Sequence, residues 1–183
     1  TTKPVTGVCA GVYSLTVTDT KSCTVVSAVI VDNINGPDGA TMSTTNASCN
    51  GVCNGNSTVV AVSGGTPGFT YLWQNGSTTN TASALCAGTF ILTITDSLSC
   101  KHFETYVVSQ PTLIAANISI INATCNGIAN GNAASSPSGG VSSYTFNWST
   151  GAISSSISTL LAGTYPLTIT DSKGCTKLDT ANV

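Results

Sequence analysis

The sequence predicts an all-β protein made of tandem immunoglobulin-like β-sandwich modules, each of about 75 residues and held by disulfides. The first observation behind this prediction is a stretch that occurs three times, most fully as Leu85–Cys100. Its recurring aspartates, Asp19, Asp96 and Asp171, lie 77 and 75 residues apart. A fixed period of this size indicates small domains in tandem, each able to close its own core.

The second observation is the periodicity inside the repeated stretch. Phe90, Leu92 and Ile94 alternate with Ile91, Thr93 and Thr95, which is typical of a strand with one buried face and one hydroxyl-rich face. The equivalent apolar residues in the other copies are Tyr13, Leu15, Val17, Tyr165, Leu167 and Ile169. Further strands are expected at residues 57–63, 68–74, 105–108 and 144–149. No stretch has a convincing helical period, so several short strands per module predict a compact sandwich.

The period also predicts the module boundaries. Residues 1–31 match the C-terminal part of a first module, 44–108 a second module, and 116–183 a third. Residues 32–43 and 109–115 are expected to be linkers, because they contain Gly, Pro, Asn and Asp. Linkers this short favour a semi-rigid rod. The rest of the first module belongs either to a longer chain, of which this sequence is a window, or to a neighbouring subunit that supplies strands.

Two tryptophans occupy matching positions in the second and third modules. Trp73 follows Tyr71-Leu72, and Trp148 follows Phe146-Asn147. A tryptophan on a middle strand of a sandwich is expected to anchor the core. The alternative is a platform on which a sugar ring stacks.

The composition excludes several classes of function. Only 7% of the 183 residues are charged, arginine is absent, and the net charge is −2. Without a basic patch, nucleic-acid binding is not expected. No apolar run reaches the roughly 18 residues that a membrane span requires, and the N-terminal residues have no signal-peptide core, so we expect a mature or internal start. The hydroxyl-rich surface suits packing against copies of the same chain, attached glycans, or simply an uncharged secreted domain.

Eight cysteines predict an oxidising, extracellular environment. The four in the second module, Cys49, Cys53, Cys86 and Cys100, allow three pairings. The third module keeps Cys125 and Cys175 but has Ala129 and Leu161 opposite Cys53 and Cys86. Because the third module lacks equivalents of both Cys53 and Cys86, these two cysteines are expected to pair with each other. The simplest pairing is therefore Cys49–Cys100, Cys53–Cys86 and Cys125–Cys175. Cys9 and Cys23 would then have partners in the missing part of the first module.

Other chemistry is poorly supported by the sequence. A zinc site of four thiolates could not form in the third module, and a redox pair would need Cys-x-x-Cys on an α/β scaffold. His102 is the only histidine, and no serine lies in a nucleophile elbow. Each recurring aspartate ends a strand and is expected to cap the next turn, whereas calcium needs more carboxylates than the modules offer. We therefore expect no enzymatic activity, no metal and no cofactor.

The recurring positions form an ordered set of motifs. In the second module they are Cys49–Gly51, Asn54–Gly55, Val62–Pro67, Tyr71–Trp73, Leu85, Ala87–Phe90 and Thr93–Cys100. In the third they are Cys125–Gly127, Asn130–Gly131, Gly139–Gly140, Trp148, Leu161–Tyr165 and Gly174–Cys175. This set resembles the SprB repeat, with Ser99 in place of the usual glycine. Nearly the whole chain takes part in the resemblance.

The resemblance implies a segment of a very large surface protein of Bacteroidota-type bacteria, exported by the type IX secretion system. Proteins with this repeat include adhesins used in gliding motility and surface proteins anchored at the C-terminus. In such hosts, Asp-Ser/Thr followed by a small apolar residue is a pattern for O-glycan attachment, which makes Ser97 and Thr180 candidate acceptors. Asn-x-Ser/Thr sequons also occur, as expected by chance in a chain of this composition.

These observations give one main hypothesis and two alternatives. The main hypothesis is a structural repeat segment that builds a semi-rigid stalk or polymer of an extracellular adhesin or filament. Its partners would be neighbouring repeats of the same long chain or copies of the chain itself. The alternatives are a module that binds surface polysaccharide and an accessory segment of a secreted enzyme.

Overall fold

The computed structural model describes residues 4–32 and 36–183, in which every regular element is a β-strand. The chain divides into two compact units. Unit 1 contains the described residues up to Thr45 together with Gly55–Val108, and unit 2 contains Asn46–Asn54 and Ser109–Val183. Accordingly, no helix of the described chain is long and apolar enough to cross a membrane.

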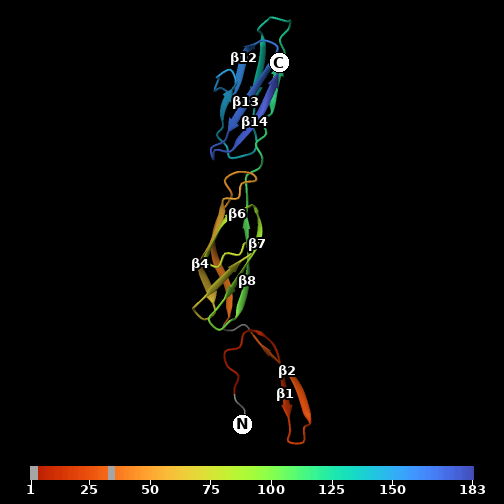
Figure 1. Cartoon of the computed structure of the whole chain (residues 1–183), viewed down its shortest axis with the longest axis vertical. Helices are drawn as coiled ribbons and strands as arrows, with labels where there is room; N and C mark the ends of the chain where they lie inside the picture. The colour runs from red at the N-terminus through yellow and green to blue at the C-terminus, as the bar shows by residue number, and fades with distance from the viewer. Residues whose placement is uncertain (1–3, 33–35) are drawn as a thin grey trace. The chain divides into compact units, whose positions relative to one another are not determined.

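Unit 1 contains a β-sandwich and a separate hairpin (Figure 1). Its strands are β1 Gly11–Thr18, β2 Thr24–Val31, β3 Pro37–Thr45, β4 Gly55–Gly64, β5 Thr70–Trp73, β6 Thr81–Leu85, β7 Gly88–Thr95 and β8 Lys101–Val108. The sandwich has two antiparallel sheets with strand orders β3-β4-β6 and β5-β7-β8. This division, with the first, second and fourth strands opposite the third, fifth and sixth, is an immunoglobulin-like arrangement.

Unit 2 repeats this topology. Its strands are β9 Ile118–Ile121, β10 Gly131–Ser135, β11 Thr145–Trp148, β12 Ser156–Leu160, β13 Thr164–Thr170 and β14 Thr176–Asn182. The two sheets have the orders β9-β10-β12 and β11-β13-β14, strand for strand equivalent to the sandwich of unit 1. The predicted fold class, tandem immunoglobulin-like sandwiches, is confirmed.

The core of each sandwich consists of the residues that the two-residue period predicts. In β7, Leu92 and Ile94 are fully buried, whereas Ile91 on the opposite face is 51% exposed. Trp73 and Trp148 are 1% and 2% exposed, and each donates its indole N–H to a backbone carbonyl six residues later. Both tryptophans are therefore core residues, which removes them as sugar platforms.

The hairpin β1–β2 pairs in a continuous register from Gly11 opposite Val31 to Thr18 opposite Thr24. The strand prediction is confirmed here, but the buried face is not. Leu15 and Val17 are each 53% exposed, since no second sheet covers the hairpin among the described residues.

The predicted linker at residues 32–43 differs from the structure. Asn33–Asn35 lie outside the described residues, and most of the remaining segment forms the edge strand β3 from Pro37 onward. The sequence Gly36-Pro37-Asp38-Gly39 is typical of a turn, yet proline is compatible with the first position of an edge strand. A register shift between Pro37 and Gly39 accommodates the proline and glycine, and a second shift lies between Thr41 and Met42. Residues 109–115 contain no strand, and Ala115 forms an isolated bridge with Ser138.

The buried tryptophan of unit 2 gives a first testable prediction. Trp148→Ala removes the largest core side chain, so we expect the stability of unit 2 to fall by about 3–5 kcal/mol. Differential scanning calorimetry should show this as a lower unfolding temperature for one of the two units. The matched control is Ile153→Ala, because Ile153 is 79% exposed and its truncation should change stability by less than about 0.5 kcal/mol. Equal effects of the two substitutions would contradict the assigned core.

Candidate functional site

The hairpin between the last two strands of each sandwich is organised by one aspartate. Asp96 Oδ1 accepts the backbone N–H of Leu98 at 3.0 Å and of Cys100 at 2.8 Å. Asp171 Oδ1 accepts those of Lys173 and Cys175 at 2.8 and 2.9 Å. The aspartates thus have the turn-capping role expected from the sequence, and each fixes the position of the last cysteine of its module.

The second oxygen of each carboxylate connects this hairpin to another turn. Asp96 Oδ2 accepts the N–H of Thr66 at 3.1 Å, and Asp171 Oδ2 accepts that of Val141 at 2.8 Å. Both aspartates are buried, at 4% and 5% exposure. Each carboxylate therefore joins the glycine-rich turn that follows the second strand to the cysteine-bearing hairpin.

These hydrogen bonds lower the pKa of both carboxyls. For Asp96, the N–H of Thr66 has the largest effect, and the hydrogen bonds from Cys100 and Leu98 add to it against the opposing effect of burial. For Asp171, burial is the largest single influence and would raise the pKa. The hydrogen bonds from Val141, Cys175, Lys173 and Gly174 together outweigh it.

The hairpin β1–β2 contains the same turn. Asp19 Oδ1 accepts the backbone N–H of Lys21 at 2.8 Å and of Cys23 at 2.9 Å. Cys23 therefore occupies the position of Cys100 and Cys175, but its thiol is free and exposed.

The disulfides do not follow the predicted pairing. Cys100 bonds to Cys9, with Cα atoms 5.1 Å apart, and Cys175 bonds to Cys49, with Cα atoms 5.6 Å apart. Cys125 is a free, exposed thiol. The predictions Cys49–Cys100 and Cys125–Cys175 are therefore wrong. Cys53 and Cys86 are each disulfide-bonded, and their pairing with one another stays a prediction.

Strand register explains why Cys125 and Cys175 do not pair. Cys175 immediately precedes β14, whereas the loop of Cys125 leads into Gly131, which lies against Val183 just after β14. The seven residues of β14 therefore separate the two loops, a length of roughly 20 Å. A disulfide requires Cα atoms within about 7 Å. In unit 1 the same register places Cys100 before β8 and Gly55 against Val108 at its end.

In the disulfides Cys9–Cys100 and Cys49–Cys175, the last cysteine of a repeat bonds to a cysteine of the preceding repeat. Cys9 precedes β1 in the first repeat, and Cys100 ends the Asp96 turn of the second. Cys49 lies in the loop between β3 and β4 of the second repeat, and Cys175 ends the Asp171 turn of the third. The recurring turn thus serves as the attachment point for an earlier part of the chain.

The loop that carries Cys49 is an integral part of unit 2. Asn46 Oδ1 accepts the N–H of Ser109 at 3.0 Å, and the N–H of Ala47 donates to the Ser109 carbonyl at 3.0 Å. Asn50 Nδ2 donates to the Pro111 carbonyl at 3.0 Å. We therefore treat the Cys49 loop (residues 46–54), residues 109–111 and the Asp171 turn as one candidate site for joining repeats.

A hollow beside the Cys49–Cys175 bond is lined only by uncharged residues. Its wall includes Asn50, Val52, Pro111 and Ile114. None of the lining residues is Asp, Glu, His, Lys or Arg. This hollow has no group suited to acid–base catalysis.

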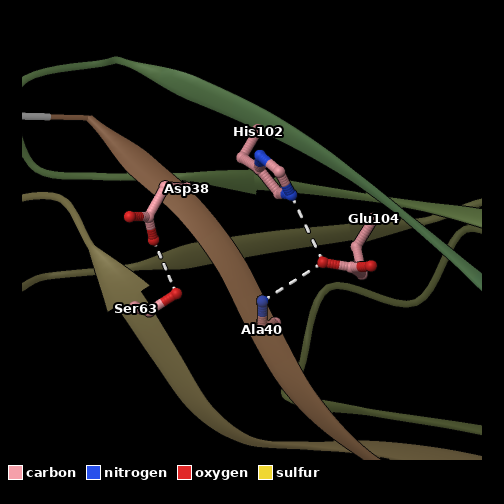
Figure 2. Close-up of polar contacts among 5 residues, drawn as sticks. All are labelled: Asp38, Ala40, Ser63, His102 and Glu104. Atoms are coloured by element: carbon pink, nitrogen blue, oxygen red, sulfur yellow. Dashed lines mark hydrogen bonds and ion pairs between the residues drawn. The ribbon is translucent and has the colours of Figure 1, made fainter. Parts of the chain in front are cut away.

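The one histidine lies in a structural contact in unit 1, shown in Figure 2. His102 Nε2 lies 3.2 Å from Glu104 Oε2, and the same oxygen accepts the N–H of Ala40 at 3.1 Å. Since Ala40 is on β3 and Glu104 on β8, the contact joins the edges of the two sheets. Ser63 Oγ donates to Asp38 at 2.6 Å, so its partner is a carboxylate and not the imidazole.

The remaining candidate residues lie on the surface. Ser97 is exposed in the Asp96 turn, and Thr180 is exposed on β14, so glycosylation of either residue stays a prediction. Among residues 4–32 and 36–183, no group of three or more His, Cys, Asp or Glu side chains is placed to hold a metal ion.

The Asp171 turn gives a second testable prediction. Since the folded state lowers the Asp171 pKa, its stabilising effect is complete above the unfolded value near 4 and is lost as the pH falls through the lower folded value. Asp171→Asn replaces Oδ2 with a group that cannot accept the Val141 N–H. We expect lower stability at pH 7 and a weaker dependence on pH below 4. Urea unfolding measured from pH 7 to pH 2.5 tests both effects.

The control for this experiment is Asp179→Asn, because Asp179 is exposed on β14. Its substitution should leave both the stability and its pH dependence close to those of the unchanged chain. If Asp171→Asn behaved like this control, the turn would not depend on the carboxylate.

Comparisons with known proteins add a family. The model of the SprB repeat matches residues 41–78 and 117–153. No curated protein matches the chain. A solved C-terminal 282-residue fragment of intimin, in complex with the intimin-binding domain of the translocated intimin receptor, is similar at 19% identity. The match covers 81% of this chain and 64% of the intimin fragment's length.

The TM-score of that match is 0.40, too low to carry an argument. The fold assignment therefore depends on the strand order and core described above. Both matched regions begin in the first strand of a sandwich or just before it and end at or just beyond its tryptophan strand. The SprB repeat model therefore matches an equivalent region in each of the two sandwiches.

Proposed function

We propose that the chain is a structural segment of an extracellular adhesin or surface filament, in which disulfide-joined repeats form a semi-rigid stalk. The match of the SprB repeat model to two regions of the chain supports a segment of a cell-surface adhesin. The disulfides agree with an extracellular location. Export by the type IX system and a part in gliding motility are finer proposals, supported by the resemblance to surface proteins with this repeat.

The observation that supports a stalk is the covalent route through the disulfides. From Cys9 to Cys175 the polypeptide backbone is 166 residues long. The bond Cys49–Cys175 provides a shorter route of 40 residues, from Cys9 to Cys49 and across the disulfide. A pulling force applied at the ends is therefore carried by covalent bonds that bypass most of both sandwiches.

Such a bypass suits a protein that holds a cell under shear. Sandwiches held by hydrogen bonds and apolar packing unfold under force and lengthen by the full contour of the chain. Where disulfides bridge the load path, unfolding releases only the chain outside the bridge. We propose that the disulfides between successive repeats serve to limit this lengthening under force.

We also propose that the chain is not an enzyme and that its partners are neighbouring repeats or further copies. The carboxylates of Glu104 and Asp38 bind the polar groups of His102 and Ser63, which supports structural roles for all four. A polysaccharide-binding role has no support from Trp73 or Trp148, because both are buried.

Stretching single molecules by handles at the two ends tests the stalk. With the disulfides intact, we expect the distance between Cys9 and Cys175 to stay within the contour of 40 residues. Reduction should add at least 126 residues of contour, or about 400 Å at roughly 3.3 Å per residue. The control is a chain with all eight cysteines replaced by serine, whose extension should be the same with and without reductant. Equal extension with and without reductant would contradict the proposal.

A further inference from the structure

The loop of unit 2 that contains the free Cys125 has nearly the same sequence as the loop that contains Cys49. Residues 122–127 read Asn-Ala-Thr-Cys-Asn-Gly, and residues 46–51 read Asn-Ala-Ser-Cys-Asn-Gly. Each loop joins the first strand of a sandwich to the second, β9 to β10 in one case and β3 to β4 in the other. The chemistry available to Cys49 is therefore present at Cys125.

The two loops also share their internal geometry. Asn54 accepts the Ser48 N–H at 2.9 Å and donates to Ser48 Oγ at 2.8 Å. Asn130 accepts the Thr124 N–H at 3.0 Å and donates to Thr124 Oγ1 at 2.8 Å. The glycine after the cysteine-asparagine pair has a φ of 75° at Gly51 and 78° at Gly127, in the left-handed region that glycine adopts without strain. The Cys125 loop thus has the folded shape of the bonded one.

The loops differ in what covers them. Ala47 is buried and Cys49 half-buried, because the Cys49 loop is held by residues 109–111 and by Cys175. Thr124, Cys125 and Asn126 are exposed. The side chain of Asn126 and the N–H of Gly127 have no hydrogen-bond partner among the described residues. Their equivalents donate to Pro111 and Gln110.

Apart from Cys125, the third repeat has no cysteine that could bond to a following repeat. Ala129 and Leu161 stand where the second repeat has Cys53 and Cys86, and Cys175 is already bonded. In both paired disulfides, the last cysteine of a repeat bonds to the preceding repeat. By this rule Cys125 is the one position in the third repeat to which the next repeat can attach.

We propose that the loop 122–130 is a docking site for a further repeat of this kind, and that Cys125 forms a disulfide with the last cysteine of that repeat. The incoming linker accepts hydrogen bonds from Asn126 and Gly127, and its Asp-x-x-x-Cys turn supplies the thiol. Two thiols become one disulfide and lose two protons and two electrons. A disulfide oxidant such as oxidised glutathione takes these up and becomes two thiols.

This inference rests on the proposed stalk, because it names the partner that extends it. The test is a chain in which residues 109–183 are repeated directly after Val183, which continues the register in which Val183 is equivalent to Val108. The protein is folded in a buffer of reduced and oxidised glutathione. Its disulfides are then mapped by digestion without reduction and mass spectrometry.

We expect a peptide pair that joins Cys125 to the last cysteine of the added repeat, with at least tenfold more of this pair than of any other Cys125 product. Cys125→Ser should leave the added cysteine as a free thiol. The Cys49–Cys175 pair is the internal control for folding. If that control pair formed while Cys125 stayed reduced, the docking site would be wrong and the stalk proposal would be untouched.

A second experiment uses the chain at its present length and does not depend on folding of the added repeat. Cys23→Ser keeps the Cys125 loop, and Cys125→Ser keeps the Cys23 turn. Mixed in the same glutathione buffer, the two variants should form a Cys125–Cys23 heterodimer in large excess over symmetric dimers of either variant. Symmetric dimers alone, or no dimer at all, would overturn the recognition of the cysteine turn by the loop.

Discussion

The bond between the last cysteine of one repeat and a cysteine of the repeat before it is the constraint on which this structure depends. Asp171 accepts the backbone N–H of Cys175 and so helps to hold this cysteine in the position where it bonds to Cys49. The same carboxylate binds the N–H of Val141, so the turn is also fixed to its own sandwich. Within unit 2, the core, the turn and the disulfide therefore form one connected arrangement.

This arrangement suits a chain with few charges. With 7% charged residues, the protein has little opportunity for surface ion pairs between modules. It uses covalent bonds and uncharged hydrogen bonds, such as that from the Asn50 side-chain amide to the Pro111 carbonyl. Neither depends strongly on salt, in contrast to ion pairs between exposed charges.

Much of the fold could be predicted from the sequence, because local patterns determine it. The alternation through Phe90, Leu92 and Ile94 identified the buried face, and the matching tryptophans identified the core. The strand β3 was missed because its start, Gly36-Pro37-Asp38-Gly39, has the composition of a turn. The short strand β6 was missed because Thr81–Leu85 has only two buried side chains.

The cysteine pairing could not be predicted in the same way. The third repeat lacks equivalents of both Cys53 and Cys86, which divides the cysteines into two sets. This division gives no information on whether a bond stays within one repeat. Strand order does give that information, since Cys125 and Cys175 lie beyond opposite ends of β14. A pairing inferred from the sequence would therefore have needed the register of the sheet as well as the repeat.

The most direct test of this account is a map of the disulfides in native protein taken from its source, digested without reduction. We expect linked peptides that contain Cys49 and Cys175. A linked pair of Cys125 and Cys175 would instead show that each repeat closes on itself. The repeats would then be joined by the backbone alone.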